Sequence, residues 1–280
     1  MLVSGTVLLR EARSKNKCIP QFNINNLEWT KIILEKCNEL NYPVILGASE
    51  GAIKYMGGYK TVTNIVKGLI DDLDVKIPII LHLDHGTSIE SCIKAIDSGF
   101  TSVMIDASKY NLEDNIKITK EVVNYAHQKG AIVEGELGYV GGSEDNIANE
   151  IKYTNIEDAF KYVKETNIDL FAPAIGNAHG IYKGKPNLDL DLLAELNKKV
   201  NVPLVLHGGS GIYDNQIVEL IRGGITKINI NTELQIAWSK GVRLYLDNNK
   251  DVYDPRKIIL SGKEEMISVI KSKIKLFNNI

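Results

Sequence analysis

The chain has 280 residues, of which 44% are hydrophobic and 24% are charged. This composition suits one large globular domain and excludes a collagen, a disordered tail and a disulfide-stapled mini-protein. Lys and Arg number 33 against 35 Asp and Glu, a formal net charge of -2, so no uniform positive field attracts nucleic acid or an anionic membrane. We therefore expect any anionic ligand to be bound by a local site.

Three cysteines, Cys18, Cys37 and Cys92, are spread along the chain without paired spacing. A sparse, odd count of this kind is typical of a reduced cytosolic protein whose thiols lie in the core. Residues 1–13 contain no hydrophobic region of a signal peptide, and no window approaches the ~18 apolar residues of a membrane span. We therefore predict a cytoplasmic protein without a membrane or nucleic-acid partner.

Short apolar runs rich in Val and Ile alternate with helical patterns, as is typical of parallel βα units. The runs are almost continuously hydrophobic because parallel strands are covered on both faces. Eight runs favour a TIM (β/α)8 barrel that occupies residues 1–280 as a single domain. The runs are Ile19–Asn23, Pro43–Ser49, Pro78–Asp84, Ser102–Ser108, Ala131–Leu137, Leu170–Gly176, Pro203–Gly209 and Lys227–Asn231.

Several helix starts are indicated by capping residues. Thr87 and Glu90 have the spacing of a capping box, while Asn26 and Asp214 each precede an amphipathic pattern. A last helix is predicted from about Lys263 to Phe277. These helices are expected to pack outside the barrel.

Three of the five histidines follow or end predicted strands, and each is followed by glycine: His85, His179 and His207. The carboxyl ends of barrel strands meet at one rim, so these rings are expected to converge. Three imidazoles with an open fourth position are typical of a catalytic zinc site. His82 is instead expected to support a ligand or to lie in the core, and His127 to lie on the surface near a helix end.

Carboxylates crowd the same predicted rim. Asp84 and Asp106 end strands, and Glu134 and Glu136 share one face of another. Buried anions at this density require a cation nearby. Asp84, next to a candidate ligand, is the better candidate for proton transfer. For Asp106 and Glu134, capping a helix or bonding backbone amides is an equally open role.

A glycine-rich segment follows the seventh predicted strand, where barrels often bind phosphate through backbone amides. It runs Gly208-Gly209-Ser210-Gly211. Lys183, on the preceding loop, is a candidate for one cationic contact. Asn229 and Asn231 alternate on the eighth run, and buried Asn side chains there need partners such as substrate hydroxyls.

Taken together and in order, these motifs resemble the class II, metal-dependent fructose-1,6-bisphosphate aldolases over nearly the whole chain. The resemblance implies a TIM barrel that binds catalytic Zn²⁺ through His85, His179 and His207 and assembles as a homodimer or tetramer. The matching segments are Gln21–Asn23, Val44–Gly47, His82–Gly86, Ser102–Ser108, Glu136–Gly138, Gly141-Gly142, His207–Gly211 and Lys227–Thr232.

The resemblance also implies roles for single residues. Asp84 matches the acid/base for the C4 hydroxyl, Glu144 matches the carboxylate that handles the proton on the enediolate carbon, and Asn229 is a further catalytic candidate. Asp106 and Glu136 match a second divalent ion position, and a monovalent cation (Na⁺ or K⁺) often assists phosphate binding. The phosphorylated sugar substrate is expected to contact Asn23, Ser49, Gly180, Lys183, Gly208, Gly209, Ser210, Asn229, Ile230, Asn231, Thr232 and, from a neighbouring subunit, Arg256.

Alternatives remain open from the sequence. Asn231 stands where some fructose-type members have Asp and tagatose-type members tend to have Ala. Asn231 therefore favours fructose 1,6-bisphosphate, with tagatose 1,6-bisphosphate as the alternative substrate. Gln235 stands where some members have Arg.

A Schiff-base aldolase needs a lysine inside the barrel, whereas Lys227 is expected to point to the wrong rim. A barrel hydrolase usually has His-x-His on its first strand, where this chain has Gln21-Phe22-Asn23. A binding protein with structural zinc is a further alternative.

Overall fold

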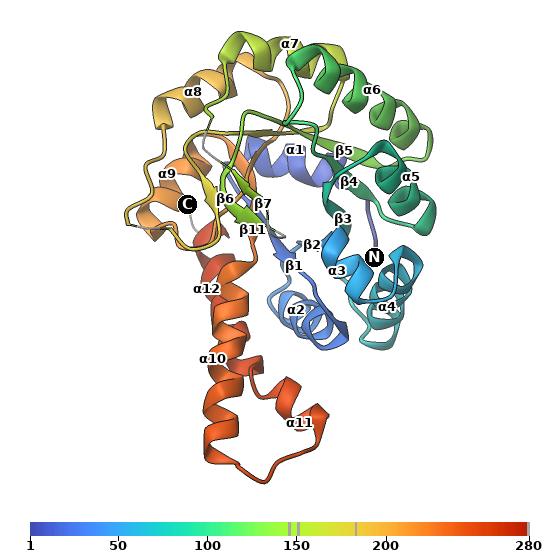
Figure 1. The fold of residues 1–280 in the computed structure, drawn as a ribbon, viewed down its shortest axis with the longest axis vertical. Helices are drawn as coiled ribbons and strands as arrows, with labels where there is room; N and C mark the ends of the chain where they lie inside the picture. The colour runs from blue at the N-terminus through green and yellow to red at the C-terminus, as the bar shows by residue number, and fades with distance from the viewer. Residues whose placement is uncertain (145–146, 150–151, 183, 279–280) are drawn as a thin grey trace.

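The computed structural model describes residues 1–144, 147–149, 152–182 and 184–278. Its central feature is a closed barrel of parallel strands in the order β1-β11-β10-β8-β5-β4-β3-β2 (Figure 1). The predicted (β/α)8 barrel is thus confirmed. The strands are β1 (Ile19–Asn23), β2 (Val44–Ser49), β3 (Ile79–Gly86), β4 (Ser102–Ile105), β5 (Ile132–Leu137), β8 (Leu170–Pro173), β10 (Leu204–Leu206) and β11 (Ile225–Ile230).

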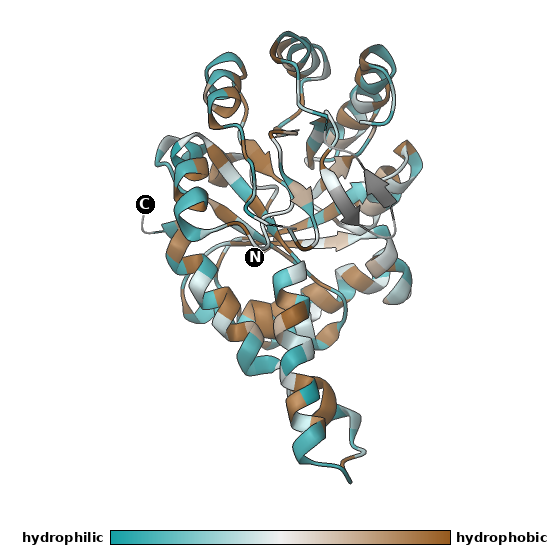
Figure 2. Cartoon of the chain, turned by 60° about the vertical axis from the view of Figure 1, so that its left-hand side comes forward, coloured by the Kyte–Doolittle hydropathy of each residue, from teal (hydrophilic) through white to brown (hydrophobic). Residues whose placement is uncertain are grey.

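Helices surround the barrel and bury apolar faces against it, so the strands are covered from outside (Figures 1 and 2). The helices are α1 (Thr6–Ser14), α2 (Leu27–Glu39), α3 (Glu50–Tyr55), α4 (Tyr59–Asp72), α5 (Ile89–Ser98), α6 (Leu112–Gln128), α7 (Ile156–Thr166), α8 (Leu190–Lys199), α9 (Asp214–Arg222), α10 (Thr232–Asn248), α11 (Pro255–Leu260) and α12 (Lys263–Asn278). None of the helices in the described ranges is long and apolar enough to cross a membrane.

Helix α1 has no counterpart among the predicted elements. Its buried residues Leu9 and Ala12 pack against apolar side chains that point into the amino-terminal end of the barrel, including Ile19, Ile45 and Ile80. This helix therefore covers that end of the barrel.

Two predicted helix caps need correction. Asn26 does cap α2, accepting a hydrogen bond from the Trp29 amide at 2.8 Å. Helix α5, however, is capped by Ser88, not by Thr87, which instead donates to the Glu50 carboxylate.

The start of α9 also differs. Asp214 is its first helical residue and follows the cap position, which Tyr213 occupies without a side-chain cap. Asp214 therefore acts through its charge at the positive end of the helix, not as a hydrogen-bonding cap. The last predicted helix is present as α12.

A small second sheet stands above the carboxyl rim of the barrel. It has the order β7-β6-β9 and consists of β6 (Gly141–Glu144), β7 (Ile147–Asn149) and β9 (Ala178–His179). Gly141 pairs with Ala178 and Gly142 with His179. The loops after β5 and β8 are therefore joined by strand pairing, which the sequence pattern did not indicate.

Helices α10 and α11 extend from the barrel as an arm (Figure 1). The arm exposes large apolar side chains, among them Leu244 and Tyr253, the latter 91% exposed. Apolar residues on the arm are visible as brown segments far from the main body (Figure 2).

Candidate active site

The three predicted ligand histidines lie together at the carboxyl rim. His85 is near the end of β3, His207 directly follows β10, and His179 comes from β9. One ring nitrogen from each lies within 4.8 Å of the others. Nε2 of His85 is 2.8 Å from Nδ1 of His207. His85 has a φ of +50°, a left-handed conformation that is uncommon for residues other than Gly. Strain of this kind is typical of functional sites.

In both His85 and His207, the ring nitrogen that does not face the other histidine contacts a carboxylate. Asp106 lies 3.1 Å from Nδ1 of His85, and Glu134 lies 2.8 Å from Nε2 of His207. An ionised carboxylate only accepts, so each of these nitrogens donates its hydrogen. The two nitrogens that face each other then both present lone pairs, which require a proton or a cation between them. Imidazole nitrogens with lone pairs, on rings that are each held by a carboxylate, fit a divalent metal ion.

Asp106 is well suited to hold His85 in place. Burial alone raises the pKa of Asp106, but its hydrogen bonds with His85 and Ser108 and the charge of His85 outweigh that effect and lower the pKa overall. Ser108 donates from both its hydroxyl, at 2.7 Å, and its amide. Asp106 therefore stays ionised, which also makes it available to a cation.

A second potential ligand group shares His85 with the first. One atom each from His85, Asp106 and Glu136 lie within 4.8 Å of one another. Glu136, on β5, is 97% buried. The two residues predicted for a second ion are thus adjacent to the histidine cluster.

Asp84 is buried next to the histidines and held from both sides. Its Oδ2 accepts from Asn23 Nδ2 at 2.8 Å, and its Oδ1 accepts from Asn229 Nδ2 at 3.2 Å. Asn229 Nδ2 also lies 3.5 Å from Nδ1 of His207. The three residues come from β1, β3 and β11, so barrel closure assembles this group.

A buried ion pair lies below the histidine cluster. Lys227 Nζ is 2.7 Å from Glu134 Oε2, and neither side chain is exposed to solvent. Burial alone raises the pKa of Glu134, but the charge of Lys227 and the hydrogen bond from His207 reverse the effect and lower it. The expectation that Lys227 points to the wrong rim is wrong. Strand β11 begins at Ile225, two residues earlier than predicted, and period-two alternation directs Lys227 into the barrel.

His82 lies in the same interior, as expected for a core or supporting residue. Its Nδ1 is 2.7 Å from Ser102 Oγ, and its Nε2 is 3.8 Å from Glu134 Oε2. Burial, followed by the charge of Lys227, lowers the pKa of His82 to about 3. His127 lies in the last turn of α6, with Nε2 2.8 Å from Asp169.

Some of the residues predicted to bind phosphate line a pocket of about 440 Å³ beside the histidine cluster. Gly180, Ser210 and Thr232 all line it. Ser210 accepts a hydrogen bond from the Glu233 amide in the first turn of α10. The pocket thus opens onto the positive end of a 17-residue helix, a favourable place for an anion.

Other predicted contacts have restricted roles. The Gly209 amide donates to the Asn229 carbonyl at 3.1 Å, so that amide is not free for a phosphate. Ile230 packs into the core around the barrel, which leaves only its backbone to face a ligand. Asn231 occupies the cap position of α10, and Ser49 caps α3 by accepting from the Ala52 amide.

The side chains of two predicted site residues lie outside the part of the chain that the structure describes. Lys183 lies outside the described residues. Glu144 lies in β6, opposite Ile147, but the described part of the chain does not include its side chain. The proposed roles of both residues remain predictions.

The chain matches the family model described as "Fructose-bisphosphate aldolase class-II" over residues 3–280. It belongs to this family. Fructose-bisphosphate aldolase from Geobacillus stearothermophilus is 50% identical over 279 residues, covering 99% of this chain and 97% of the relative. Fructose-bisphosphate aldolase from Staphylococcus aureus strain Mu50 is 50% identical over 277 residues, with the same coverage. The predicted family is thus confirmed.

Solved structures of aldolases have the same fold. The YdjI aldolase from Escherichia coli K12 matches with a TM-score of 0.86 at 32% identity, covering 99% of this chain and 98% of that one. Fructose-bisphosphate aldolase from Campylobacter jejuni matches with a TM-score of 0.84 at 25% identity, covering 100% and 96%. Class II aldolases are generally metal-dependent, in accord with the histidine cluster.

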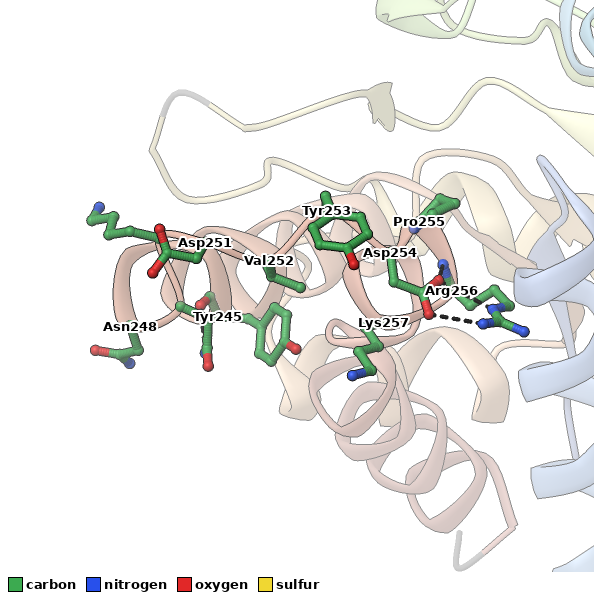
Figure 3. Close-up of a pocket in the computed structure, with 11 residues that line it drawn as sticks. Tyr245, Asn248, Asp251, Val252, Tyr253, Asp254, Pro255, Arg256 and Lys257 are labelled. Carbon is green, nitrogen blue, oxygen red and sulfur yellow. Dashed lines mark hydrogen bonds and ion pairs between the residues drawn. The ribbon is translucent and has the colours of Figure 1, made fainter.

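In this class II aldolase chain, Arg256 is not brought to its own histidine cluster. It lies in α11 beside a hollow of about 790 Å³ at the tip of the arm (Figure 3). The preceding helix α10, at ~1.5 Å per residue, separates the tip from the pocket by about 25 Å. Arg256 donates to Asp254 at 2.9 Å, and its side chain is 86% exposed. It is therefore available to another molecule.

Sequence reasoning missed three side chains around the site. Lys227 was placed at the wrong end, although its spacing of two from Asn229 predicts that both face inward. Asn177 donates to the His207 carbonyl at 3.0 Å, and Tyr182 bonds backbone atoms of both histidine loops. The last two contacts had no signal in the sequence, because they join loops that only barrel closure brings together.

Proposed function

We propose that this protein catalyses the reversible aldol cleavage of fructose 1,6-bisphosphate into dihydroxyacetone phosphate and glyceraldehyde 3-phosphate. The observation that carries this proposal is the cluster of three imidazoles between buried Asp84 and an anion pocket containing Ser210 and Thr232. The relatives at 50% identity, which are named fructose-bisphosphate aldolases, support it.

We propose zinc as the metal, held by His85, His179 and His207. A divalent ion bound there would supply a Lewis acid for the substrate carbonyl. Asp106 and Glu134 fix the orientation and tautomer of two of the rings, so that Nε2 of His85 and Nδ1 of His207, which lie 2.8 Å apart, face the proposed ion.

Asp84 is proposed to exchange the proton of the C4 hydroxyl. When that proton leaves, the bond between C3 and C4 breaks, C4 becomes the aldehyde carbon, and the electron pair remains on the triose fragment that contains C3. Asn23 and Asn229 donate to the two carboxylate oxygens, which orients Asp84. Glu144 is proposed to return a proton to the carbon that retains the electron pair.

The ketose phosphate is proposed to bind in the pocket of Gly180, Ser210 and Thr232. There, the positive end of α10 stabilises the charge of a bound anion. Lys183 and a monovalent cation, Na⁺ or K⁺, are proposed to assist.

We further propose a homodimer or tetramer in which Arg256 from one arm binds the far phosphate at the site of a neighbour. The exposed guanidinium and the exposed apolar residues of the arm support this. Asp106 and Glu136 are proposed as ligands of a second or alternative ion position.

The test is removal of the metal. Purified protein is treated with EDTA, and triose release from fructose 1,6-bisphosphate is assayed before and after adding Zn²⁺ back. We expect activity to fall by orders of magnitude and to return with the metal. Full activity in protein shown to be metal-free would overturn the proposal.

The same assay with tagatose 1,6-bisphosphate checks the alternative substrate. We expect the specificity constant to favour the fructose epimer. A preference for tagatose would replace the substrate while leaving the aldol chemistry in place.

A further inference from the structure

Tyr182 has no part in the chemistry proposed above, yet its hydroxyl joins the two loops that hold His179 and His207. The hydroxyl accepts a hydrogen bond from the Ala178 amide at 2.9 Å and donates one to the Gly208 carbonyl at 3.0 Å. Ala178 immediately precedes His179, and Gly208 immediately follows His207. One oxygen atom therefore links the immediate neighbours of two candidate ligands.

The two loops are in direct contact at this point. A Cβ atom at Gly208 would overlap the Ala178 carbonyl, and the Gly208 backbone has a φ of +67°. Gly180, with a φ of +86°, turns the chain so that Tyr182 can reach back to Ala178. Both positions favour glycine, because a side chain is strained at positive φ, and the close approach adds a second reason at Gly208.

His179 depends on such contacts more than the other two histidines do. His85 belongs to barrel strand β3, and His207 directly follows barrel strand β10. His179 instead belongs to the two-residue strand β9, which pairs with β6 above the rim and is not part of the barrel. The barrel sheet therefore does not fix its distance from His207, and bonds between the loops must do so.

The ring of Tyr182 also forms part of the wall of the anion pocket with Gly180, Ser210 and Thr232. Burial raises the pKa of Tyr182 to about 12, so its hydroxyl keeps its hydrogen at neutral pH and can donate to Gly208. The residue thus contacts both parts of the site, the histidine loops and the pocket.

We propose that Tyr182 is a positioning residue whose hydroxyl sets the spacing of His179 and His207 and thereby the affinity for the metal. This inference rests on the proposed metal site of three imidazoles. Supporting residues behind metal ligands typically change metal affinity 10- to 100-fold when they are replaced.

The test is Tyr182→Phe, which removes the hydroxyl and keeps the ring. The matched control is Tyr213→Phe, because Tyr213 lines the same pocket, is half exposed, and makes no hydroxyl hydrogen bond within the described residues. Zn²⁺ affinity is measured by competition with a chelator, and the Co²⁺-loaded proteins are compared by visible absorption. Thermal unfolding of the metal-free proteins shows whether the fold is intact.

We expect Tyr182→Phe to bind Zn²⁺ about 10-fold more weakly and to change the Co²⁺ spectrum, with Tyr213→Phe unchanged in both. Wild-type affinity and spectrum in Tyr182→Phe, or equal losses in both variants, would overturn the positioning role and leave the metal site standing. Failure of the wild-type protein itself to bind Zn²⁺ or Co²⁺ would overturn the metal site, and this inference with it.

Discussion

The two ends of the barrel interior use the same strands for opposite purposes. At the amino-terminal end the inward residues are apolar and covered by α1; we call Ile19, Ile45, Ile80 and Ile132 the lower layer. Four positions further along the same strands, the inward residues form the upper layer: Asn23, Ser49, Asp84 and Glu136. Because side chains alternate with period two, each strand supplies one residue to each layer.

Along each of these strands, the residues that pack the core and the residues that carry the proposed chemistry lie at different positions. The lower layer is packed and sealed, whereas the upper layer holds polar groups that need partners. Between them, Glu134 and Lys227 join the two regions through a buried ion pair that also contacts His207. Changes in each layer should therefore affect different measurable properties.

The largest effect is expected in the upper layer. Asp84→Ala should lower kcat by about 10²- to 10⁴-fold, because a positioned acid/base contributes about that much. Zn²⁺ content should change little, since Asp84 is not among the proposed zinc ligands. Steady-state kinetics with metal analysis checks this, and a variant that retains more than a tenth of wild-type kcat would exclude Asp84 as the proton-transfer group.

The next effect is expected between the layers. Lys227→Met should destabilise the fold by about 3–5 kcal/mol, because Glu134 is left buried and uncompensated. The double variant Lys227→Met with Glu134→Leu should recover part of that loss. Urea unfolding measures both.

A surface pair provides the control for Lys227. Lys199 lies 2.8 Å from Glu157, and both side chains are substantially exposed. Lys199→Met should cost less than about 1 kcal/mol. Equal losses in the free energy of unfolding for Lys227→Met and Lys199→Met would contradict the conclusion that burial makes the Lys227–Glu134 pair more costly to break.

A smaller effect is expected in the sealed end. Leu9→Ala should lower the free energy of unfolding by about 2–4 kcal/mol, because it leaves a cavity over the lower layer. Activity at 25 °C should stay near the wild-type value. Val7→Ala, on the same helix at a position 70% exposed, is the matched control and should be nearly neutral. If Leu9→Ala lost activity without losing stability, the assignment of stability to the lower layer and chemistry to the upper layer would be contradicted.

The smallest effect concerns His82. Its pKa is lowered to about 3, first by burial, so the folded state stays neutral while the unfolded state takes up a proton below about pH 6.5. Stability from this group is therefore lost as pH falls, by about 1 kcal/mol between pH 6 and pH 5. His82→Asn should reduce that slope in urea unfolding. An unchanged slope would show that His82 is not the group responsible.

The barrel, the family and the residues that carry the proposed chemistry could all be predicted from the amino-acid sequence. The eight apolar runs, the His-Gly pairs and the carboxylates at strand ends all follow from local alternation, which does not depend on distant parts of the chain. The apolar pattern predicts that the last strand begins at Lys227, whereas β11 begins at Ile225, and this difference of two residues is enough to misplace Lys227.

The partner of each of these groups could not be predicted from the sequence and follows from how the strands and loops come together in the fold. Glu134 meets Lys227 and His207, Asp84 meets Asn23 and Asn229, and Tyr182 joins two loops, each contact spanning different strands or loops of the barrel. No local pattern encodes such contacts, because they arise when closure of the sheet brings distant strands together. The seal formed by α1 has the same origin, since a short amphipathic helix has no defined place until the open end of a barrel exists to receive it.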